Sequence, residues 1–480
     1  MRLRQFVIDG LGHLSTLLID DDAGAAAVVD PRRDVDVYLA AAAQDRVRIT
    51  HVVETHLHND YVSGARELAA LTGATHVIGA GAALAYEHRG VRHGDGFDVG
   101  ALAFRALETP GHTPEHVAYS VADTTRASEP VLLLTGGSLL VGAVGRTDLL
   151  GAENAVRYAH DLFRSLHDVV MPHADFVAVH PTHGAGSLCS TGIASTPSST
   201  IGFERRHNPM LEPSEPDAFA RALLPGQPAF PRYFARMRPT NQAGPTPLGR
   251  VPGARPLPLP EVLAALARGA IVVDARQPAA HAVSHVPGSV SIPAGSSFGT
   301  WLGWIVEPDR PVVLVLDRPD DWDDLVRQSL RIGHESVVGY LHGGLATWAE
   351  AGQPVESSGR LSVTELAARI SNRGPETPIV VDVRQATEYR DGHVEGAVHL
   401  FAGSLQDRLD ELPRDRPIVT MCASGFRSSI AASLLRAAGF TDVSWVADGV
   451  PAWTALGLPV ERGGSPPDEA RSHAAASHGH

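Results

Sequence analysis

The sequence contains no lysine and only two cysteines, Cys189 and Cys422, which lie far apart in the chain. Two distant cysteines exclude a disulfide framework, so each thiol needs its own explanation. All 40 basic residues are therefore arginines, and the formal net charge is -14. This balance argues against a nucleic-acid partner, because phosphate binding normally needs a basic face and the sequence shows none. Chemistry on small molecules is the expectation.

Long apolar runs are also absent. Hydrophobic residues make up 44% of the chain, but no run approaches the roughly 18 uninterrupted residues that would span a bilayer. The first residues, "MRLRQFVIDGLGHLSTLLIDDD", reach acidic side chains before any long apolar segment, so they do not resemble a signal peptide. We therefore expect no membrane role and a cytoplasmic location.

With 480 residues, the chain is too long for one ordinary core and suggests roughly three domains. Residues 1–245 alternate short apolar strands such as "PVLLLTG" with turn glycines and helical stretches, of which "NAVRYAHDLFRSLHDVV" is the clearest. This pattern predicts one large mixed domain. A stretch rich in proline and glycine, "AGPTPLGRVPGARPLPLP", follows and is typical of a stiff linker.

Beyond the linker the sequence repeats itself. "IVVDARQPAAHAVSHVPGSVSIP" matches "IVVDVRQATEYRDGHVEGAVHLF", and "GHESVVGYLHGGLATWAEAGQPV" matches "GFTDVSWVADGVPAWTALGLPVE". Two tandem copies of one domain, at 256–357 and 360–463, are the simplest interpretation. Each copy has an order of strands and helices that suits a parallel sheet covered by helices, an α/β fold. The polar segment 464–480 is expected to be a disordered tail.

The second repeat contains a candidate nucleophile. "PIVTMCASGFRSSIAASLLRAAGF" places Cys422 at the end of a buried strand, with a glycine-containing loop and a helix directly after it. Backbone N–H groups of the loop and the helix N-terminus, together with the charge of Arg427, would lower the pKa of such a thiol. They would equally stabilise a persulfide on it. A buried, inert cysteine is the alternative.

This segment resembles the rhodanese sulfurtransferases. The six-residue loop "CASGFR" and the upstream "VDVRQATEYRDGHVEGAVHL" carry the resemblance. It implies that Cys422 accepts a sulfane sulfur as a persulfide and passes it to a thiol or cyanide. The substrate cradle would be Ala423, Ser424, Gly425, Phe426 and Arg427. An arsenate reductase or phosphatase of the same fold class fits less well, since those usually have a longer loop.

The first repeat lacks this chemistry. An ungapped alignment of "PVVLVLDRPDDWDDLVRQSLRIG" with the second repeat puts Leu316 opposite Cys422 and Asp321 opposite Arg427. Both the nucleophile and the cation are lost, and acidic residues fill a loop that would have to hold an anion. We expect this copy to be a structural or docking domain.

The N-terminal region contains a candidate metal site. "THLHNDY" supplies His56, His58 and Asp60, "ETPGHTPEHVAYS" supplies His112, and "AVHPTHGAGSLCS" supplies His183. This ordered set of loops resembles the metallo-β-lactamase fold over about the first 210 residues. "PGHTP" and "GRTDL" are most similar to its persulfide dioxygenase and glyoxalase II branch. The resemblance implies an αββα sandwich of the α+β class, with histidines and a carboxylate meeting at one edge to hold iron or zinc.

Two positions depart from the family pattern. Tyr61 stands where "HxHxDH" has its last histidine, and Gly137 stands where "TGD" would place a metal-bridging aspartate. A dinuclear hydrolase would need both, so the sequence argues against one. The three imidazoles of His56, His58 and His112 with water would still form a mononuclear site. For iron, His58 or Asp60 would have to replace the absent carboxylate. A domain without catalytic function stays the alternative.

Two neighbouring residues have open roles. Arg146, in "GRTDL", could orient an acidic thiol substrate or could pair with Asp148, and the pair is the simpler interpretation. Cys189 lies just after His183 and could accept a persulfide, although an ordinary buried thiol is the simpler interpretation here too.

Together these resemblances imply a sulfur-metabolism enzyme that joins a mononuclear-metal persulfide dioxygenase-like domain to a sulfurtransferase. One Fe(II) or Zn(II) per chain is expected. The expected partners are a low-molecular-weight thiol persulfide and thiosulfate or sulfite, and tethering would raise the effective concentration of a shared intermediate. The alternatives are a sulfur relay in which only Cys422 reacts and a glyoxalase II-like zinc thioester hydrolase. The thiol carrier and a homo-oligomeric state are left open.

Overall fold

The computed structural model describes residues 1–372, 374 and 376–464. The chain divides into two compact units: Met1–Val251 with Leu330–Gly333, and Pro252–Ser329 with the residues from His334 onward. The division falls inside the stretch rich in proline and glycine. The domain limits stay a prediction, and the predicted disordered tail lies, apart from Gly464, outside the described residues.

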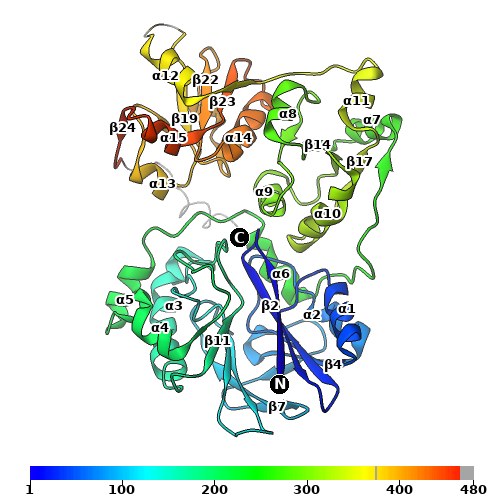
Figure 1. Ribbon diagram of the computed structural model, residues 1–480, viewed down its shortest axis with the longest axis vertical. Helices are drawn as coiled ribbons and strands as arrows, with labels where there is room; N and C mark the ends of the chain where they lie inside the picture. The colour runs from blue at the N-terminus through cyan, green and yellow to red at the C-terminus, as the bar shows by residue number, and fades with distance from the viewer. Residues whose placement is uncertain (373, 375, 465–480) are drawn as a thin grey trace. The chain divides into compact units, whose positions relative to one another are not determined.

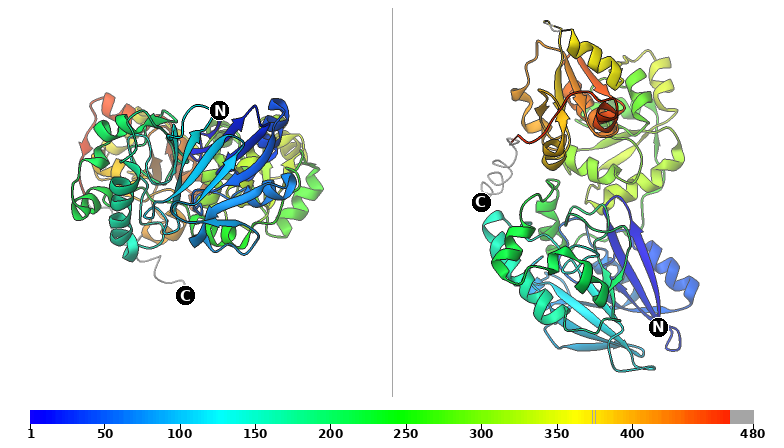
Figure 2. Two further views of the ribbon diagram at one scale, coloured as in Figure 1. Left: turned by 90° about the horizontal axis from the view of Figure 1, so that it is seen from below. Right: turned by 60° about the vertical axis from the view of Figure 1, so that its left-hand side comes forward.

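The first unit contains two six-stranded sheets, coloured blue and cyan to green in Figures 1 and 2. In spatial order the first sheet comprises β1 (Arg2–Ile8), β2 (His13–Asp20), β3 (Ala25–Val29), β4 (Arg48–Val53), β5 (Thr75–Gly79) and β6 (Arg89–Val91). The second comprises β12 (Ser199–Thr200), β11 (Ala178–Pro181), β10 (Leu132–Gly136), β9 (Val117–Asp123), β8 (Leu102–Glu108) and β7 (Gly96–Val99). The helices are α1 (Asp36–Asp45), α2 (Ala65–Thr72), α3 (Ala152–Arg164), α4 (Ile201–His207), α5 (Pro216–Leu223) and α6 (Phe234–Ala243).

Apolar side chains on both faces of each sheet produce the layers. In β2, Leu18 belongs to the core between the sheets, whereas Leu17 and Ile19 pack against Tyr38 of α1 and Leu68 of α2. Successive strand residues point to opposite faces, so a continuous apolar run can bury both. Each such side chain contributes about 1.5–3 kcal/mol when fully buried.

The second sheet is covered in the same way. Leu134 of β10 faces the first sheet, and Leu133 packs outward with Leu162 of α3 and Phe219 of α5. The predicted αββα sandwich is confirmed. The helix expected from "NAVRYAHDLFRSLHDVV" is α3, which continues as a π-helical turn over Ser165–Val170.

The second unit contains two parallel five-stranded sheets of the same strand order. The first has β13 (Pro256–Leu257), β17 (Val337–Leu341), β16 (Val312–Val315), β14 (Ile271–Asp274) and β15 (Val290–Ser291), with helices α7 (Leu259–Ala267), α8 (Pro278–Val283), α9 (Phe298–Ile305), α10 (Trp322–Arg331) and α11 (Gly344–Glu350). The second has β18 (Gly359–Leu361), β23 (Val443–Val446), β22 (Ile418–Met421), β19 (Ile379–Asp382) and β21 (Val398–His399), with helices α12 (Val363–Ser371), α13 (Ala386–Asp391), α14 (Phe426–Ala437) and α15 (Gly449–Ala455). A short ribbon, β20 (His393–Val394) with β24 (Val460–Glu461), is added to the second copy. The predicted tandem α/β repeat is confirmed.

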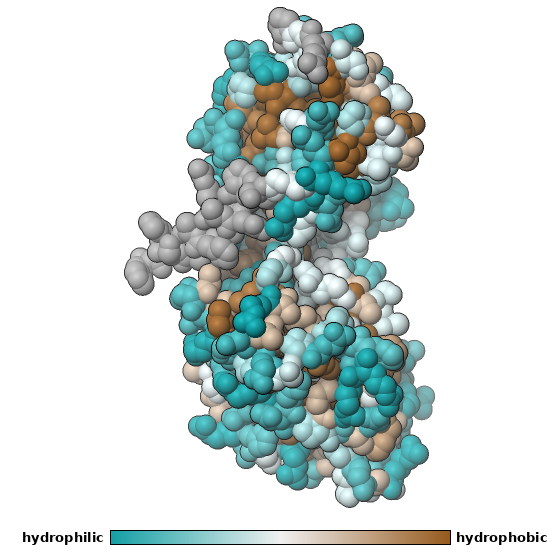
Figure 3. Space-filling view, turned by 90° about the vertical axis from the view of Figure 1, so that its left-hand side faces the viewer, coloured by the Kyte–Doolittle hydropathy of each residue, from teal (hydrophilic) through white to brown (hydrophobic). Residues whose placement is uncertain are grey.

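Neither the described helices nor the surface view of Figure 3 shows a long apolar segment. Among the described residues, none of the helices has both the length and the apolar character that crossing a bilayer requires. On the face drawn in Figure 3, hydrophilic residues predominate over the first unit, and hydrophobic residues gather mainly on the second.

Candidate active sites: a histidine cluster and a cysteine loop

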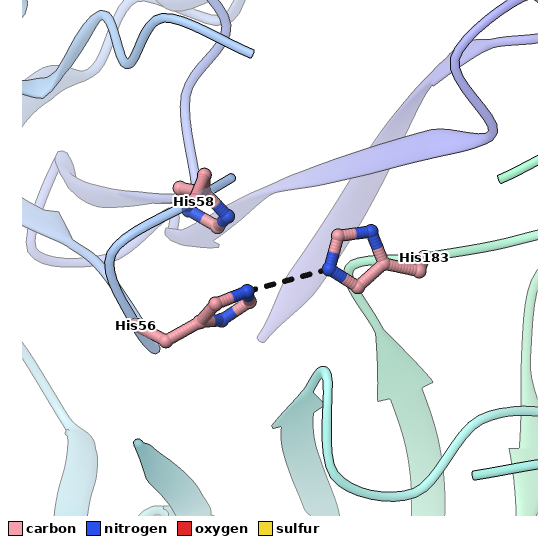
Figure 4. Close-up of side chains that lie close together, drawn as sticks. All are labelled: His56, His58 and His183. Carbon is pink, nitrogen blue, oxygen red and sulfur yellow. Dashed lines mark hydrogen bonds between the residues drawn. The ribbon is translucent and has the colours of Figure 1, made fainter. Parts of the chain in front are cut away.

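The loops that follow the strands of the first unit bring the predicted histidines together. His56 and His58 follow β4, His112 follows β8 and His183 follows β11, and all four side chains are buried. The ring centroid of His56 lies 4.3 Å from that of His58, 5.0 Å from that of His112 and 5.4 Å from that of His183. Figure 4 shows His56, His58 and His183 turned toward one another. The side chains quoted from three separate motifs therefore form one cluster.

Two groups of metal-binding atoms share His183. The donor atoms of His56, His58 and His183 lie within 4.8 Å of one another, and so do those of His112, His183 and Cys189. The Nε2 atoms of His56 and His183 are 3.3 Å apart. Two nitrogens bound tetrahedrally to one zinc ion at about 2.0–2.1 Å would be about 3.3–3.4 Å apart. The spacing thus fits two ligands of a single metal ion.

Hydrogen bonds fix the tautomers of two of these rings. The Thr55 hydroxyl donates to Asp30 Oδ2 at 2.9 Å, so it accepts from Nδ1–H of His56 at 2.8 Å. Nδ1–H of His112 donates to the carbonyl oxygen of Arg146 at 2.8 Å. In both neutral rings the lone pair is left on Nε2. Such bonds behind the ligand are typical of histidines that bind metals.

Buried polar atoms without hydrogen bonds supply a second indication. Among the described residues, neither ring nitrogen of His58 and neither carboxylate oxygen of Asp60 makes a well-aligned hydrogen bond. Asp60 Oδ2 lies 3.3 Å from His183 Nδ1, and His58 Nε2 lies 3.3 Å from Asp30 Oδ1. Burying such groups without full pairing is costly. A divalent cation would offset that cost, so the residues fit a metal site.

The charge states of His56, His112 and Asp60 suit metal binding, whereas burial is outweighed at His183 by Cys189 and Asp60, which raise its pKa well above the usual value. Burial, followed by the nearby His58, places the pKa of His56 well below its usual range. Burial and then His183 lower the pKa of His112 to about 3. Burial alone would raise the pKa of Asp60, but His183 and its other histidine neighbours lower it to about 2. At neutral pH His56 and His112 are therefore uncharged and Asp60 is ionised, as metal ligands must be.

Tyr61 does not substitute for the histidine that the family motif would have. Its hydroxyl donates to the carbonyl oxygen of Asp30 at 3.3 Å, and its ring stacks on His58 at 4.4 Å between centroids. Burial, reinforced by Asp30 and Asp60, raises its pKa well above the usual value, so it stays a neutral phenol. Tyr61 holds His58 in place as a packing partner.

Gly137 leaves no room for a side chain. A Cβ atom added there would lie 2.2 Å from Cδ2 and 2.7 Å from Nε2 of His112. Its N–H donates to Nε2 of His116 at 2.9 Å. An aspartate at this position would displace His112. The local backbone conformation therefore excludes the metal-bridging carboxylate that the family motif has here.

Two further residues of this site are not among those predicted from the sequence. Asp30, directly after β3, accepts from the Thr55 N–H at 2.8 Å and from the hydroxyls of Thr55 and Thr182. His116 is buried, and its Nδ1–H donates to the Thr109 hydroxyl at 2.8 Å. The only signals were an aspartate ending the apolar run "AAAVVD" and a second histidine in "PGHTPEH".

The guanidinium of Arg146 has several hydrogen-bond acceptors. It donates to both carboxylate oxygens of Asp148, at 2.6 and 2.7 Å, and to the carbonyl oxygens of Leu188 and Pro228. This is the structural pair that the sequence favoured. Its predicted part in substrate binding stays a prediction.

The second site is the loop after β22. Cys422 is fully buried, and its sulfur accepts a hydrogen bond from Ser424 N–H at 3.5 Å and lies 3.6 Å from the Ser428 hydroxyl oxygen. Gly425 has φ +84° and precedes the first residue of α14. A Cβ there would also lie 2.6 Å from the Ala447 carbonyl oxygen, so only glycine fits this turn. The loop therefore aims a backbone donor and a helix N-terminus at the sulfur.

The predicted cation of this loop has a carboxylate partner. Arg427 bonds Glu388 of α13 through both terminal nitrogens, at 2.5 and 2.8 Å. Burial disfavours its charge, but Glu388 keeps the pKa of Arg427 above its usual value. Part of its charge is therefore balanced by Glu388 before any anion binds.

In the first repeat the equivalent loop differs as the alignment predicts. Leu316 follows β16, and Asp321 pairs with Arg318 at 2.5 Å. The loop borders a cavity of about 360 Å³ whose lining includes the carboxylates of Asp317, Asp321 and Asp324 and one guanidinium, that of Arg318, so the acidic groups are in excess. These acidic groups oppose a thiosulfate or persulfide anion. The inactivity of this copy stays a prediction.

The αββα sandwich with its histidine cluster and the two parallel-sheet repeats define the class of this protein. The profile of the metallo-beta-lactamase superfamily matches residues 8–191, and that of the rhodanese-like domain matches 259–351 and 362–456. The chain belongs to the metallo-beta-lactamase superfamily and carries tandem rhodanese-like domains behind that fold.

Individual proteins resemble different lengths of the chain. The hydroxyacylglutathione hydrolase of Methylococcus capsulatus is 32% identical over 246 residues, 46% of this chain and 91% of that protein. A metallo-beta-lactamase crystal structure from Staphylococcus aureus covers 71% of this chain and 98% of its own, with 28% identity and a TM-score of 0.64. The crystal structure of ETHE1 from Myxococcus xanthus covers 51% of this chain and 99% of its own, with 29% identity and a TM-score of 0.44.

Proposed function

We propose that the chain is an enzyme of sulfur metabolism with two reaction sites. Cys422 transfers sulfane sulfur, and the histidine cluster acts on a low-molecular-weight thiol persulfide with one metal ion. The observation that most directly supports the first activity is the Cys422 sulfur, which accepts the Ser424 N–H beside the N-terminus of α14. These donors would stabilise the negative charge of a persulfide on Cys422.

The transfer proceeds in two displacements. The Cys422 thiolate attacks the outer sulfur of thiosulfate, a new S–S bond forms, and sulfite leaves with the electron pair of the broken bond. A thiol, as its thiolate, then attacks the outer sulfur of the Cys422 persulfide and regenerates the Cys422 thiolate. Ser424 N–H and the charge at the start of α14 act on the anion in both steps.

The transfer site is tested with Cys422→Ser. The variant is nearly isosteric, so it should fold and yet lose thiosulfate-to-thiol transfer completely. Ser429→Ala, in the helix that follows the loop and with its hydroxyl bonded to the Phe426 carbonyl oxygen, serves as the control and should retain transfer. Transfer by Cys422→Ser at the wild-type rate would refute the assignment.

The metal site is proposed to oxidise a thiol persulfide. The overall reaction, persulfide with O₂ and water giving thiol and sulfite, balances in atoms and electrons. A bound Fe(II) would supply the redox chemistry. His56 and His112 present unprotonated nitrogens, while the Thr55 hydroxyl, itself bonded to Asp30, and the Arg146 carbonyl oxygen hold their rings. The absence of side-chain ligands at Tyr61 and Gly137 supports a site with one metal ion.

Hydrolysis of a thioester with zinc is the second candidate. It is favoured by the similarity to a protein named hydroxyacylglutathione hydrolase over 91% of that protein. It is disfavoured by the loss of two second-metal ligands at positions 61 and 137. A chain in which only Cys422 reacts is the third possibility.

Metal analysis of the purified chain separates the three. About one equivalent of iron, with persulfide-dependent O₂ uptake that is lost in His112→Ala, supports the dioxygenase. Zinc with thioester cleavage supports the hydrolase. A metal-free chain that still transfers sulfur leaves Cys422 as the one reactive group and overturns the metal-dependent half.

A further inference from the structure

One of the two groups of metal-binding side chains contains a thiol. His112, His183 and Cys189 are buried and offer donor atoms within 4.8 Å of one another. We propose that Cys189 is a metal ligand, bound as a thiolate together with His112 and His183, and that it supplies the anionic donor that position 137 lacks. This inference rests on the proposed metal-dependent function of the domain.

The backbone around His112 explains why the anion has to come from another loop. Besides the clash at Gly137, a Cβ added at Gly145 would lie 2.8 Å from His112 Nδ1 and 2.0 Å from the Gly137 carbonyl oxygen. Two glycines thus approach the ring so closely that neither position admits a side chain. Cys189 reaches the group from the loop after β11, which also carries His183.

The backbone of Arg146 is hydrogen-bonded to both Cys189 and His112. The Arg146 N–H donates to the Cys189 carbonyl oxygen at 2.9 Å, and the Arg146 carbonyl oxygen accepts Nδ1–H of His112 at 2.8 Å. The Arg146 side chain also donates to the Leu188 carbonyl oxygen at 2.9 Å. On the other side, the Cys189 N–H donates to the Ser187 hydroxyl at 3.1 Å. The backbone of Cys189 is therefore fixed by hydrogen bonds at both its N–H and its carbonyl oxygen.

The donor set has a defined chemical preference. Two imidazoles and one thiolate suit a cation such as Fe(II), Zn(II) or Co(II), and His56, water or a thiol substrate would take the next position. Asp60, ionised and 3.3 Å from His183 Nδ1, orients that ring from behind. On binding, the Cys189 S–H bond breaks, the proton passes to solvent, and the sulfur donates a lone pair, with no change in oxidation state.

The chain supplies its own matched control, because it has only two cysteines. The full-length chain is stripped with a chelator and reloaded with Co(II) as wild type, Cys189→Ser and Cys422→Ser. Wild type and Cys422→Ser should bind one Co(II) and show the near-ultraviolet charge-transfer band of a thiolate bound to Co(II). Cys189→Ser should lose the band, and Zn(II) competition should show an affinity lower by at least about 100-fold, beyond the 10–100-fold typical of residues behind the ligands.

Each outcome is decisive. Binding of Co(II) by the wild type without a charge-transfer band, or a band that disappears in Cys422→Ser instead, overturns the inference and leaves the histidine site intact. Equal Zn(II) affinity in wild type and Cys189→Ser does the same. Failure of the wild type to bind either metal overturns the inference together with the metal-dependent function. Circular dichroism and a retained Cys422 transfer rate verify that Cys189→Ser is folded.

Discussion

Among single residues, Asp30 holds the histidine cluster together without belonging to any of its motifs. Its carboxylate accepts from Thr55 N–H and from two threonine hydroxyls, and its carbonyl oxygen accepts from Nε2–H of His13 and from Tyr61. Its φ of +50° is unusual for a residue other than glycine. Residues behind metal ligands set the orientation and basicity of those ligands.

Asp30→Asn should therefore weaken metal binding more than it weakens the fold. One carboxylate acceptor becomes an amide donor opposite Thr55, so His56 loses its fixed tautomer. We expect Zn(II) affinity to fall about 10–100-fold, measured by competition with a chromophoric chelator. The control is Asp20→Asn, which removes a buried turn carboxylate bonded to Ala101 N–H in the same unit. Equal losses of affinity in both variants would contradict this role.

The Arg427–Glu388 pair predicts a pH dependence at the cysteine loop. Burial opposes ionisation of Glu388, but its bonds to Arg427 lower its pKa below the usual 4.5. A carboxylate with a depressed folded-state pKa stabilises the fold above the unfolded-state pKa, and this stabilisation is lost as pH falls through the folded-state value. Glu388→Gln should thus lower the free energy of unfolding at pH 7.

That difference should be less than about 1 kcal/mol, since Glu388 is about one-third exposed and solvent screens the pair. It should disappear on acidification below pH 4.5. Urea unfolding of the wild type and variant at several pH values measures it. Exposed Glu395→Gln is the control and should change little at any pH. A difference that grows on acidification would show that the sign is wrong.

At the scale of elements, α9 of the first repeat packs against the Cys422 loop of the second. The Trp301 ring lies 6.1 Å from that of Phe426, which belongs to the loop, and Trp304 lies 5.0 Å from Phe401. Ser291 N–H in β15 also donates to the Ser433 hydroxyl in α14 at 3.0 Å. The copy without a cysteine therefore supports the loop of the copy that has one.

Trp301→Leu should loosen that loop and speed alkylation of the buried Cys422, followed by peptide mass spectrometry. The matched control is Trp322→Leu, because Trp322 is also buried in the first repeat but contacts Tyr340, with 5.6 Å between the ring centroids. Both changes should destabilise the unit by about 0.5–3 kcal/mol, whereas only Trp301→Leu should alter the reactivity of Cys422. Equal alkylation rates in the two variants would assign Trp301 a purely structural part.

Elements were more predictable from sequence than the contacts between them. "IVTMCASGFRSS" fixes a buried strand, a turn that needs glycine, and a helix, because each step has a local cause in apolar patterning and backbone conformation. The pairing of Arg427 with Glu388 joins segments 39 residues apart, and the support from Trp301 comes from another repeat. Such contacts depend on packing in three dimensions, which spacing along the chain does not encode.

At the scale of the whole molecule, two cysteines in two compact units predict a simple stoichiometry of sulfur uptake. The sulfur of Cys422 accepts a backbone N–H in its loop, whereas Cys189 lies among buried histidines. The first repeat has Leu316 at the matching position, and the cavity beside it is lined by three carboxylates and one guanidinium. Thiosulfate should therefore load one sulfur atom per chain, at Cys422.

Intact mass under non-reducing conditions measures this load. Wild type and Cys189→Ser should gain one sulfur atom, and Cys422→Ser should gain none. Adding Leu316→Cys to Cys422→Ser restores a thiol after β16, but Asp317 and Asp321 border that cavity, and their charge disfavours both a thiolate and a bound anion. The double variant should still gain none. Sulfur on Cys189, or recovery in the double variant, would mean that the loop at Cys422 is not what selects the nucleophile.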